Sequence, residues 1–364
     1  MITITSTPAL VCLQGQPIVF KVSSNLFDEP FFKVMAVPVS GQSELLPLNA
    51  DDEAVFDLRE YFRPELSVSF VTTPAIHANA ARQFEVFFYE YYGNPPTQHD
   101  SDSFELVVML GGIARWKQAE FLATYSGSFA NWLSANLFLS WYPAIPKRVL
   151  PDQPEVLYFL APSSATYSPT VVVTFTDGTT ASHSPSVSIA AQATEMASLP
   201  VGYTALGLAA VNPAKTVASY VVTIGGKSRS YVVDHNAYRD KRYIIFRNSL
   251  GGYDVLPCTG EVDSTTETTR NTATAVYNPE AATQRLSRMA YNIETTEVER
   301  VNTGWLQANE KHWLNELMIS EDVWEMLGGV LSPVLIRNSE LDRTERIYEP
   351  GSVEIEYERL TYAQ

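Results

Sequence analysis

Short apolar runs separated by turn-forming residues occupy the first part of the chain. The runs lie at residues 9–13, 17–22 and 31–39. Polar breaks such as Gln14-Gly15-Gln16 divide them, and this spacing is typical of the strands of a sandwich. The pattern predicts β-structure from the start of the sequence.

A longer run, residues 83–92, alternates in part between apolar and polar positions. It ends at Gly93-Asn94-Pro95-Pro96, which must turn because proline fixes φ and cannot donate a hydrogen bond to a ladder. Residues 104–110 follow as a partner strand. We therefore predict a long hairpin that closes an N-terminal β-sandwich domain spanning residues 1–114.

The middle region, residues 115–258, begins with an aromatic-rich segment, and we predict a linker at 115–151 with one short helix at 130–137. Two strand pairs follow. One turns at Thr176-Asp177-Gly178-Thr179, where Asp-Gly supplies positive φ, and the other at Gly225-Gly226-Lys227. The predicted strands are residues 156–160, 170–175, 217–224, 228–233 and 243–246. Together these patterns predict a β-rich domain.

The last region, residues 259–364, mixes strand and helix patterns. Residues 259–284 are rich in Thr, Asn and Ala, which predicts an extended segment or a mobile linker. An alternating run at 353–358 predicts a strand. One amphipathic helix is predicted to end near Ser320, from apolar residues at helical spacing: Leu306, Trp313, Leu314 and Leu317. We predict an α+β C-terminal domain.

Composition supports this fold class. The chain has 364 residues, enough for two or three domains, and its 19 Tyr and 17 Phe favour half-buried pleated surfaces. The predicted class is mainly β, with several β-sandwich-like domains in tandem and one amphipathic helix in the α+β C-terminal region. The sequence contains no apolar run of membrane-spanning length and no signal peptide, so we expect a cytoplasmic origin. Cys12 and Cys258 are expected to be reduced and structural.

The net charge of -16 is distributed unevenly. Acidic residues number 14 against 5 basic ones in residues 1–114, 8 against 11 in 115–258 and 19 against 9 in 259–364, which gives −9, +3 and −10. Both acidic ends would repel phosphates, so neither nucleic acid nor a membrane surface is expected as a partner. The basic residues of the middle region are scattered and are expected to be solvated.

Residue types that form catalytic or metal-binding sites are not spaced in this sequence as such sites require. The five histidines are not at metal-ligand spacing from one another or from a cysteine. Asp51-Asp52-Glu53 and Asp100-Ser101-Asp102 are candidates for calcium but do not fit an EF-hand loop. The sequence holds no GxSxG, HExxH, GxxxxGK[ST] or GxGxxG motif. We expect no catalytic residue, no metal and no cofactor, although the 41 carboxylates leave a hydrolase as an open alternative.

Two groups of residues are candidates for contacts with a partner. A glycine-containing turn is either a tight hairpin or a loop that inserts into a neighbouring subunit: Asn248, Gly251, Gly252, Tyr253 and Asp254. A set of aromatic residues can anchor an interface, pack in the core or stack on sugars as a glycan platform: Trp116, Trp132, Trp141, Tyr91 and Tyr92.

The glycine-containing turn lies in IIFRNSLGGYD, residues 244–254, which resembles a signature in tail or baseplate structural proteins of phages and prophages of gut Bacteroidetes. Similar segments occur in the same order at residues 88–93, 151–160 and 303–306, the last followed by Trp313-Leu314 and Ser320. The resemblance covers nearly the whole chain. It implies a non-enzymatic virion structural protein that contacts other virion proteins or further copies of itself, first in the host cytoplasm and then in the virion.

The charge distribution fits such an assembly, because the positive middle region of one subunit can meet an acidic end of the next. An alternative function is a carbohydrate-binding or adhesion protein that uses surface Trp and Tyr side chains.

Overall fold

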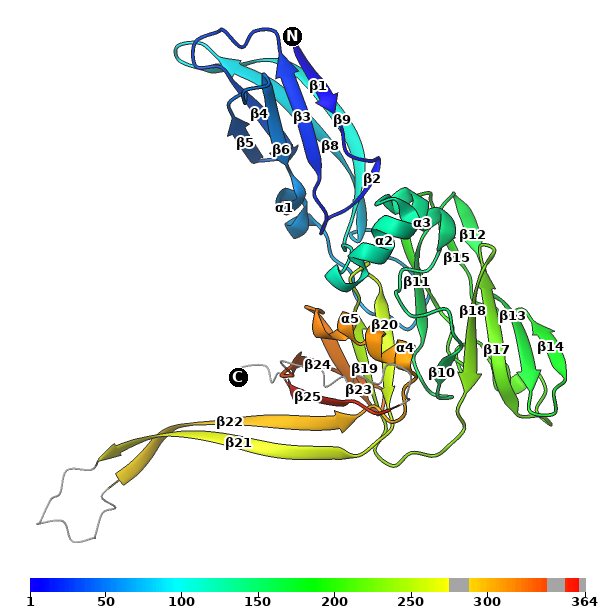
Figure 1. The fold of residues 1–364 in the computed structure, drawn as a ribbon. Coiled ribbons are helices and arrows are strands. Elements are labelled where there is room, and N and C mark those ends of the chain that lie inside the picture. The colour runs from blue at the N-terminus through cyan, green and yellow to red at the C-terminus, as the bar shows by residue number, and fades with distance from the viewer. Residues whose placement is uncertain (275–287, 339–350, 360–364) are drawn as a thin grey trace, which may run out of the picture. The chain divides into compact units, whose positions relative to one another are not determined.

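The computed structural model describes residues 1–274, 288–338 and 351–359 (Figure 1). It is mainly β, with 49% strand and 11% helix, which confirms the predicted fold class. The strands form several separate sheets, and the helices are short.

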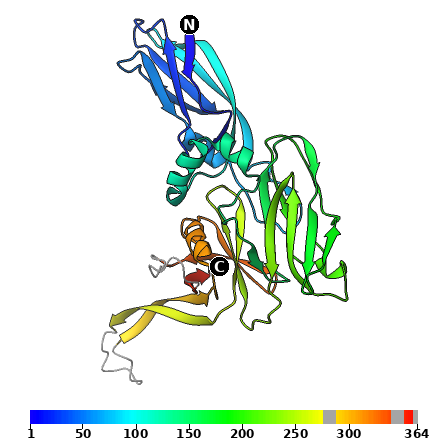
Figure 2. The same cartoon turned by 45° about the vertical axis from the view of Figure 1, so that its right-hand side comes forward.

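The chain divides into two compact units (Figure 2). Unit 1 consists of Met1–His235 and Arg247–Val255, and unit 2 of Asn236–Phe246 and Leu256–Gln364. The chain therefore enters unit 2, returns to unit 1 for nine residues and enters unit 2 again. The three predicted domains, 1–114, 115–258 and 259–364, stay a prediction.

The first part of unit 1 is a sandwich of two sheets. One sheet has the order β1-β3-β6 and the other β2-β9-β8-β4-β5. Their strands are β1 (Ile2–Ser6), β2 (Val11–Leu13), β3 (Val19–Ser24), β4 (Lys33–Val39), β5 (Gln42–Leu46), β6 (Glu53–Asp57), β8 (Ala81–Tyr92) and β9 (Thr97–Met109). A short helix, α1 (Arg59–Phe62), and a 3-10 turn, η1 (Arg63–Glu65), follow β6 in the chain. The predicted hairpin is confirmed, because β8 and β9 pair from Ala81↔Met109 to Tyr92↔Thr97.

Fully buried phenylalanines join the two sheets. Phe88 of β8 lies with its ring centroid 5.1 Å from that of Phe20 on β3 and 5.7 Å from that of Phe56 on β6. Period-2 alternation in these strands turns every second side chain inward, so the apolar positions of both sheets face one core. Burying each ring contributes about 1.5–3 kcal/mol relative to exposure.

The second part of unit 1 contains three further sheets, of order β10-β18-β17-β13-β14, β11-β16-β7 and β12-β15. Their strands are β7 (Ala75–Ile76), β10 (Lys147–Val149), β11 (Val156–Leu160), β12 (Ala165–Tyr167), β13 (Thr170–Phe175), β14 (Thr180–His183), β15 (Ile189–Ala191), β16 (Met196–Pro200), β17 (Val217–Ile224) and β18 (Lys227–Val233), with a 3-10 turn, η3 (Leu208–Ala210). Phe159 of β11 and Val173 of β13 belong to one hydrophobic core, which therefore lies between two of these sheets.

The segment between these parts holds more helix than predicted. A 3-10 turn, η2 (Arg115–Lys117), leads into α2 (Gln118–Tyr125), and α3 (Phe129–Ala135) follows. The single helix predicted at 130–137 was therefore incomplete. Ser126 and Gly127 adopt positive φ and end α2, and the Ser128 hydroxyl caps α3 by accepting a hydrogen bond from the Asn131 backbone N–H.

The largest sheet has seven strands, in the order β20-β19-β23-β24-β25-β22-β21. Its strands are β19 (Arg242–Arg247), β21 (Val262–Thr274), β22 (Arg288–Asn302), β23 (Val323–Leu327), β24 (Val330–Ile336) and β25 (Glu354–Arg359); β20 (Tyr253–Cys258) leads back from unit 1. For residues 262–274 the predicted extended segment is confirmed as β21, whereas 275–284 lie outside the described residues.

The predicted amphipathic helix is present as two short helices, α4 (Ala308–Trp313) and α5 (Asn315–Met318). All four residues of the predicted stripe, Leu306, Trp313, Leu314 and Leu317, are buried. Gln307 and Glu310 form a capping box that starts α4. No helix in the described part of the chain is long and apolar enough to span a membrane.

Glycines allow two backbone segments of unit 1 to cross at close range. The Gly112 N–H donates to the Ser249 carbonyl oxygen at 2.5 Å. Gly251 has φ +87°, and a Cβ added there would overlap the Leu110 carbonyl oxygen; a Cβ on Gly111 would lie 2.7 Å from the Leu250 carbonyl carbon. Only glycine fits such a crossing, because any side chain would push the segments apart. We call this contact the glycine crossing.

Gly251→Ala is expected to destabilise unit 1 by more than about 4 kcal/mol, because it adds both strain at positive φ and overlap with backbone. Gly226→Ala is the matched control. Gly226 also has positive φ, +78°, but nothing lies within 4 Å of an added Cβ. The control substitution is therefore expected to lower the free energy of unfolding by only about 1–2 kcal/mol. Denaturant unfolding measures both, and equal losses would contradict the account of the crossing.

Unit 2 holds a buried ion cluster. Glu325 of β23 accepts hydrogen bonds from Arg242 of β19 at 2.6 Å, Tyr357 of β25 at 2.7 Å and Arg359 of β25 at 2.9 Å. Glu299 of β22 pairs with Arg242 at 3.1 Å and with Arg359 at 2.9 Å. Burial alone would raise the pKa of Glu325, but hydrogen bonds from Arg359 and Tyr357, with the charges of both arginines, lower it below its usual value. The cluster ties four strands together.

Because the folded-state pKa of Glu325 is lowered, its contribution to stability is present above the unfolded-state value of about 4.3 and is lost as pH falls through the folded-state value. Glu325→Gln should lower the free energy of unfolding by about 3–5 kcal/mol at neutral pH, because the half-buried Arg242 and Arg359 would lose part of their compensating charge. The control is Glu356→Gln on β25, whose carboxylate pairs with exposed Arg300 at 3.0 Å, with an expected cost below about 1 kcal/mol. Unfolding as a function of pH measures both, and similar losses would refute the cluster's role.

Candidate functional site

Unit 1 buries every residue of the predicted interaction loop: Asn248, Gly251, Gly252, Tyr253 and Asp254. The turn is tight, with the Asn248 N–H donating to the Gly252 carbonyl oxygen at 2.8 Å. The Asn248 amide donates to the Leu139 carbonyl oxygen at 2.8 Å. The loop thus packs within its own chain, and its insertion into a neighbouring subunit stays a prediction.

The three tryptophans of the predicted aromatic group lie close together in unit 1. Trp132 and Trp141 are buried, with ring centroids 5.5 Å apart, and the Trp141 indole N–H donates to Ser249 at 3.1 Å. Trp116 is half-buried, with the Lys117 ammonium 4.8 Å from its ring centroid. Buried rings offer no face to a ligand from solution, so Trp132 and Trp141 act as internal packing residues.

Tyr91 and Tyr92 are half-buried and lie elsewhere in unit 1. They end β8 at its turn, roughly 35 Å along the strand from Ala81 at its other end. The Tyr92 ring stacks on His99 at a centroid distance of 3.9 Å. The five predicted aromatic residues therefore do not form one surface, and their role in partner contacts stays a prediction.

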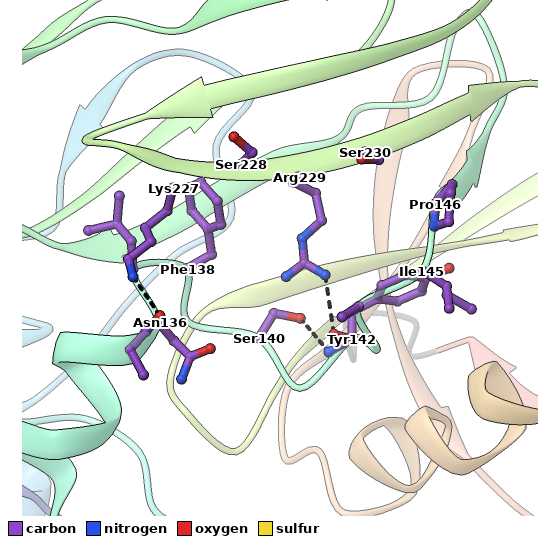
Figure 3. Close-up of a pocket in the computed structure, with 13 residues that line it drawn as sticks. Asn136, Phe138, Ser140, Tyr142, Ile145, Pro146, Lys227, Ser228, Arg229 and Ser230 are labelled. Atoms are coloured by element: carbon purple, nitrogen blue, oxygen red, sulfur yellow. Dashed lines mark hydrogen bonds between the residues drawn. The ribbon is translucent and has the colours of Figure 1, made fainter.

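A polar cleft of about 290 Å³ lies between β18 and the segment that follows α3 (Figure 3). We call it the basic cleft. Its lining residues are Ala135, Asn136, Leu137, Phe138, Ser140, Tyr142, Ala144, Ile145, Pro146, Lys227, Ser228, Arg229 and Ser230. None of the five predicted loop residues or of the five predicted aromatic residues lines it.

Two cationic side chains reach across the basic cleft from β18 (Figure 3). The Lys227 ammonium donates to the Ala135 carbonyl oxygen at 2.8 Å. The Arg229 guanidinium donates to the carbonyl oxygens of Tyr142 at 3.2 Å and Pro143 at 3.5 Å. Lys227 and Arg229 stand two residues apart on one strand, so both side chains project from the same face.

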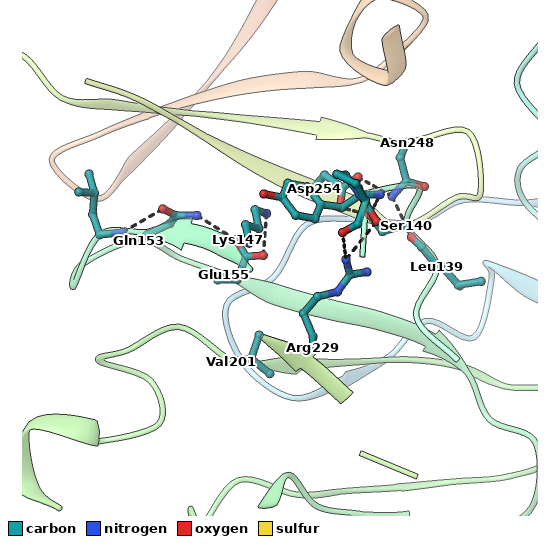
Figure 4. Close-up of polar contacts among 12 residues, drawn as sticks. Leu139, Ser140, Lys147, Gln153, Glu155, Val201, Arg229, Asn248 and Asp254 are labelled. Carbon is teal, nitrogen blue, oxygen red and sulfur yellow. Dashed lines mark hydrogen bonds and ion pairs between the residues drawn. The ribbon is translucent and has the colours of Figure 1, made fainter. Parts of the chain in front are cut away.

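A buried polar network adjoins the cleft at Ser140 (Figure 4). Lys147 and Glu155 form an ion pair at 2.7 Å, each 4% exposed, and the Gln153 amide donates to Glu155 at 2.9 Å. Asp254 accepts hydrogen bonds from the Ser140 hydroxyl at 2.8 Å and from the Asn248 amide at 3.1 Å. Both carboxylates therefore hold the scaffold of the cleft in place, which is a structural task.

Two stacked tyrosines lie beside this network. Tyr220 of β17 and Tyr231 of β18 are cross-strand partners with ring centroids 4.9 Å apart. The Tyr220 hydroxyl donates to the Val201 carbonyl oxygen at 3.0 Å, whereas the buried Tyr231 hydroxyl has no hydrogen-bond partner within the described residues. Burial, followed by the charge of Glu155, raises the pKa of both phenols well above the usual value, so both stay neutral.

A second cavity, of about 470 Å³, has a mainly apolar lining that includes Val11, Leu13, Phe121 and Phe129. Cys12 also lines it, and burial raises the pKa of this thiol to about 11. The thiol is therefore protonated at neutral pH and is a poor nucleophile and a poor metal ligand. Cys12 and Cys258 are both buried, and neither forms a disulfide within the described residues.

The sequence reasoning missed the basic cleft because it searched for adjacent basic residues. The signal was present as Lys227 and Arg229 at alternate positions of a predicted strand, Lys-Ser-Arg-Ser. On a strand, alternate positions share a face, and adjacent positions do not.

The two stacked tyrosines allow a matched test of the buried network. Tyr231→Phe removes a buried hydroxyl without a partner and should leave stability unchanged or raise it, whereas Tyr220→Phe should cost about 1 kcal/mol by removing a hydrogen bond. Denaturant unfolding of both variants provides the comparison. A larger loss for Tyr231→Phe would mean that its hydroxyl has a stabilising role.

Among residues 1–274, 288–338 and 351–359, no group of three or more His, Cys, Asp or Glu side chains is arranged to hold a metal ion. A scan of protein-family models and a search of curated proteins found no match to the sequence. The functional conclusion therefore depends on the geometry of the molecule and on the resemblance of its sequence segments.

Proposed function

We propose that the protein is a non-enzymatic structural component of a phage or prophage virion, part of the tail or baseplate, and that it acts by contacting further copies of itself. The observation that carries the proposal is the hairpin of β21 and β22. These strands are 13 and 15 residues long.

Within the part of the chain that the structure describes, the outer part of this hairpin pairs with no third strand. β25 pairs with β22 from Val298 to Asn302, so among the described strands residues 267–274 and 288–296 form backbone pairs only with each other. We call these residues the β arm. All the described side chains of β21 beyond Val262 are exposed. The β arm thus contributes almost nothing to the core of its own unit.

Such an arm is only marginally stable unless a partner covers it. A two-stranded hairpin alone is marginally stable in water, and its open edges present unpaired N–H and C=O groups that can pair with another chain. Tyr291 and Ile293 of the arm are 57% and 55% exposed. Aromatic and apolar side chains of this kind are typical anchors of protein interfaces.

Two further observations support assembly. The segments that resemble phage tail or baseplate proteins include residues 244–254, whose glycines make the crossing in unit 1. The charge distribution, −9, +3 and −10 along the chain, lets unlike regions of neighbouring copies attract one another. The alternative of a carbohydrate-binding or adhesion protein has less support, because Trp132 and Trp141 are buried.

Removal of the β arm tests the proposal. Thr266 and Glu297 are cross-strand partners, so an Asn-Gly turn between them would close a shorter hairpin and leave the pairing of β22 with β25 intact. We expect the shortened chain to unfold at the same denaturant concentration as the full chain but to lose self-association in sedimentation measurements. Self-association of the full chain should weaken as salt is added.

The control for this deletion is Val330→Asn on β24, a side chain that is 66% exposed in the same unit but outside the arm. It should leave self-association unchanged. If the shortened chain associates as strongly as the full chain, the arm is not the contact. Neighbouring genes for tube, sheath or tape-measure proteins are expected if the virion assignment is right.

A further inference from the structure

The charges of the basic cleft are not balanced by carboxylate partners. Lys227 and Arg229 donate to carbonyl oxygens, and the Arg229 guanidinium lies 5.5 Å from the centroid of the Tyr142 ring. These partners are neutral, and no carboxylate among the described residues pairs with either cation. The nearby network adds one cation, Lys147, and two carboxylates, Glu155 and Asp254. With three cations and two carboxylates, the site keeps a positive formal charge.

The spacing of the two cations suits a small oxyanion. Alternate residues of a strand lie about 7 Å apart. A group with two oxygen atoms can bridge that separation, because each charge-assisted hydrogen bond is about 2.8 Å long. Asn136 and Ser140 also lie in the lining, but the Asn136 amide already donates to Tyr125 and Trp132, and the Ser140 hydroxyl to Asp254. Lys227 and Arg229 are therefore the groups that would hold the anion.

The apolar part of the lining favours an organic anion over an inorganic one. Leu137, Phe138 and Ile145 are apolar and can cover the carbon atoms of a ligand. A cleft of about 290 Å³ has room for a ligand the size of an amino-acid side chain or a small acid. A polyanion such as nucleic acid would also have to approach a chain whose net charge is -16.

We infer that the basic cleft binds a carboxylate carried on a short carbon chain, with Lys227 and Arg229 as the binding cations. The carboxylate comes either from a free organic acid or from a glutamate or aspartate side chain of another protein. The inference goes beyond the proposed function and does not depend on it, because the cleft lies wholly in unit 1 and the β arm in unit 2.

Calorimetric titration of the full chain in Tris buffer tests the inference with four probes. Glutarate represents a free acid, and N-acetylglutamate amide mimics a glutamate side chain. N-acetylglutamine amide is its uncharged counterpart, and inorganic phosphate is a competing anion. We expect saturable binding of at least one carboxylate, and no binding of the glutamine compound.

Matched variants locate the binding. Lys227→Met and Arg229→Gln should each weaken carboxylate binding at least about tenfold, and Lys227→Arg, which keeps the charge, should retain it. Lys215→Met is the control, because Lys215 pairs with Asp177 at 2.7 Å on an exposed turn outside the cleft. Thermal unfolding checks that every variant is folded.

Tighter binding of glutarate would identify a free acid as the ligand, and tighter binding of N-acetylglutamate amide would identify a protein side chain. Four results would overturn the inference: no saturation by either carboxylate, equal binding of the glutamine compound, equal binding of phosphate, or unchanged binding in both charge-removing variants. None of these results would alter self-association through the β arm, so the two proposals can fail separately.

Discussion

The glycine crossing in unit 1 is the constraint on which the rest of that unit depends. Gly251 lies against the Leu110 carbonyl, and the Gly112 N–H donates to Ser249. The same turn places Asn248 so that its amide reaches the Leu139 carbonyl oxygen. Leu139 precedes Ser140, a lining residue of the basic cleft. The turn that was predicted as either a tight hairpin or a partner contact therefore fixes the backbone that shapes a cleft.

Buried charges in this protein are mostly used for scaffolding. Glu325 and Glu299 are satisfied by Arg242 and Arg359, and Glu155 by Lys147. Breaking such pairs is costly, because a buried charge would be left without compensation. Lys227 and Arg229 differ, since they face a cleft and contact neutral groups, the carbonyl oxygens and, for Arg229, the Tyr142 ring. That difference separates residues that hold the fold from residues available to a ligand.

Sequence patterns predicted strands and their turns well, and predicted three-dimensional neighbours poorly. The hairpin of residues 83–110 and the buried stripe from Leu306 to Leu317 follow from local periodicity and turn chemistry, and both are present. Periodicity could not tell that the loop with Gly251 faces inward, because its partner, Leu110, is 141 positions away in the chain. The basic cleft was missed for the same reason: it joins β18 to residues 135–146.

Contacts of the β arm are the proposed basis of assembly, so the decisive measurement is amide hydrogen exchange in the arm at low and high protein concentration. In dilute solution the outward-facing amides of residues 267–274 and 288–296 should exchange rapidly, since no other strand of the described residues pairs with them. At concentrations where the chain associates, the account predicts slower exchange in these residues. Exchange that stays equally fast in associated and dilute chains would contradict it.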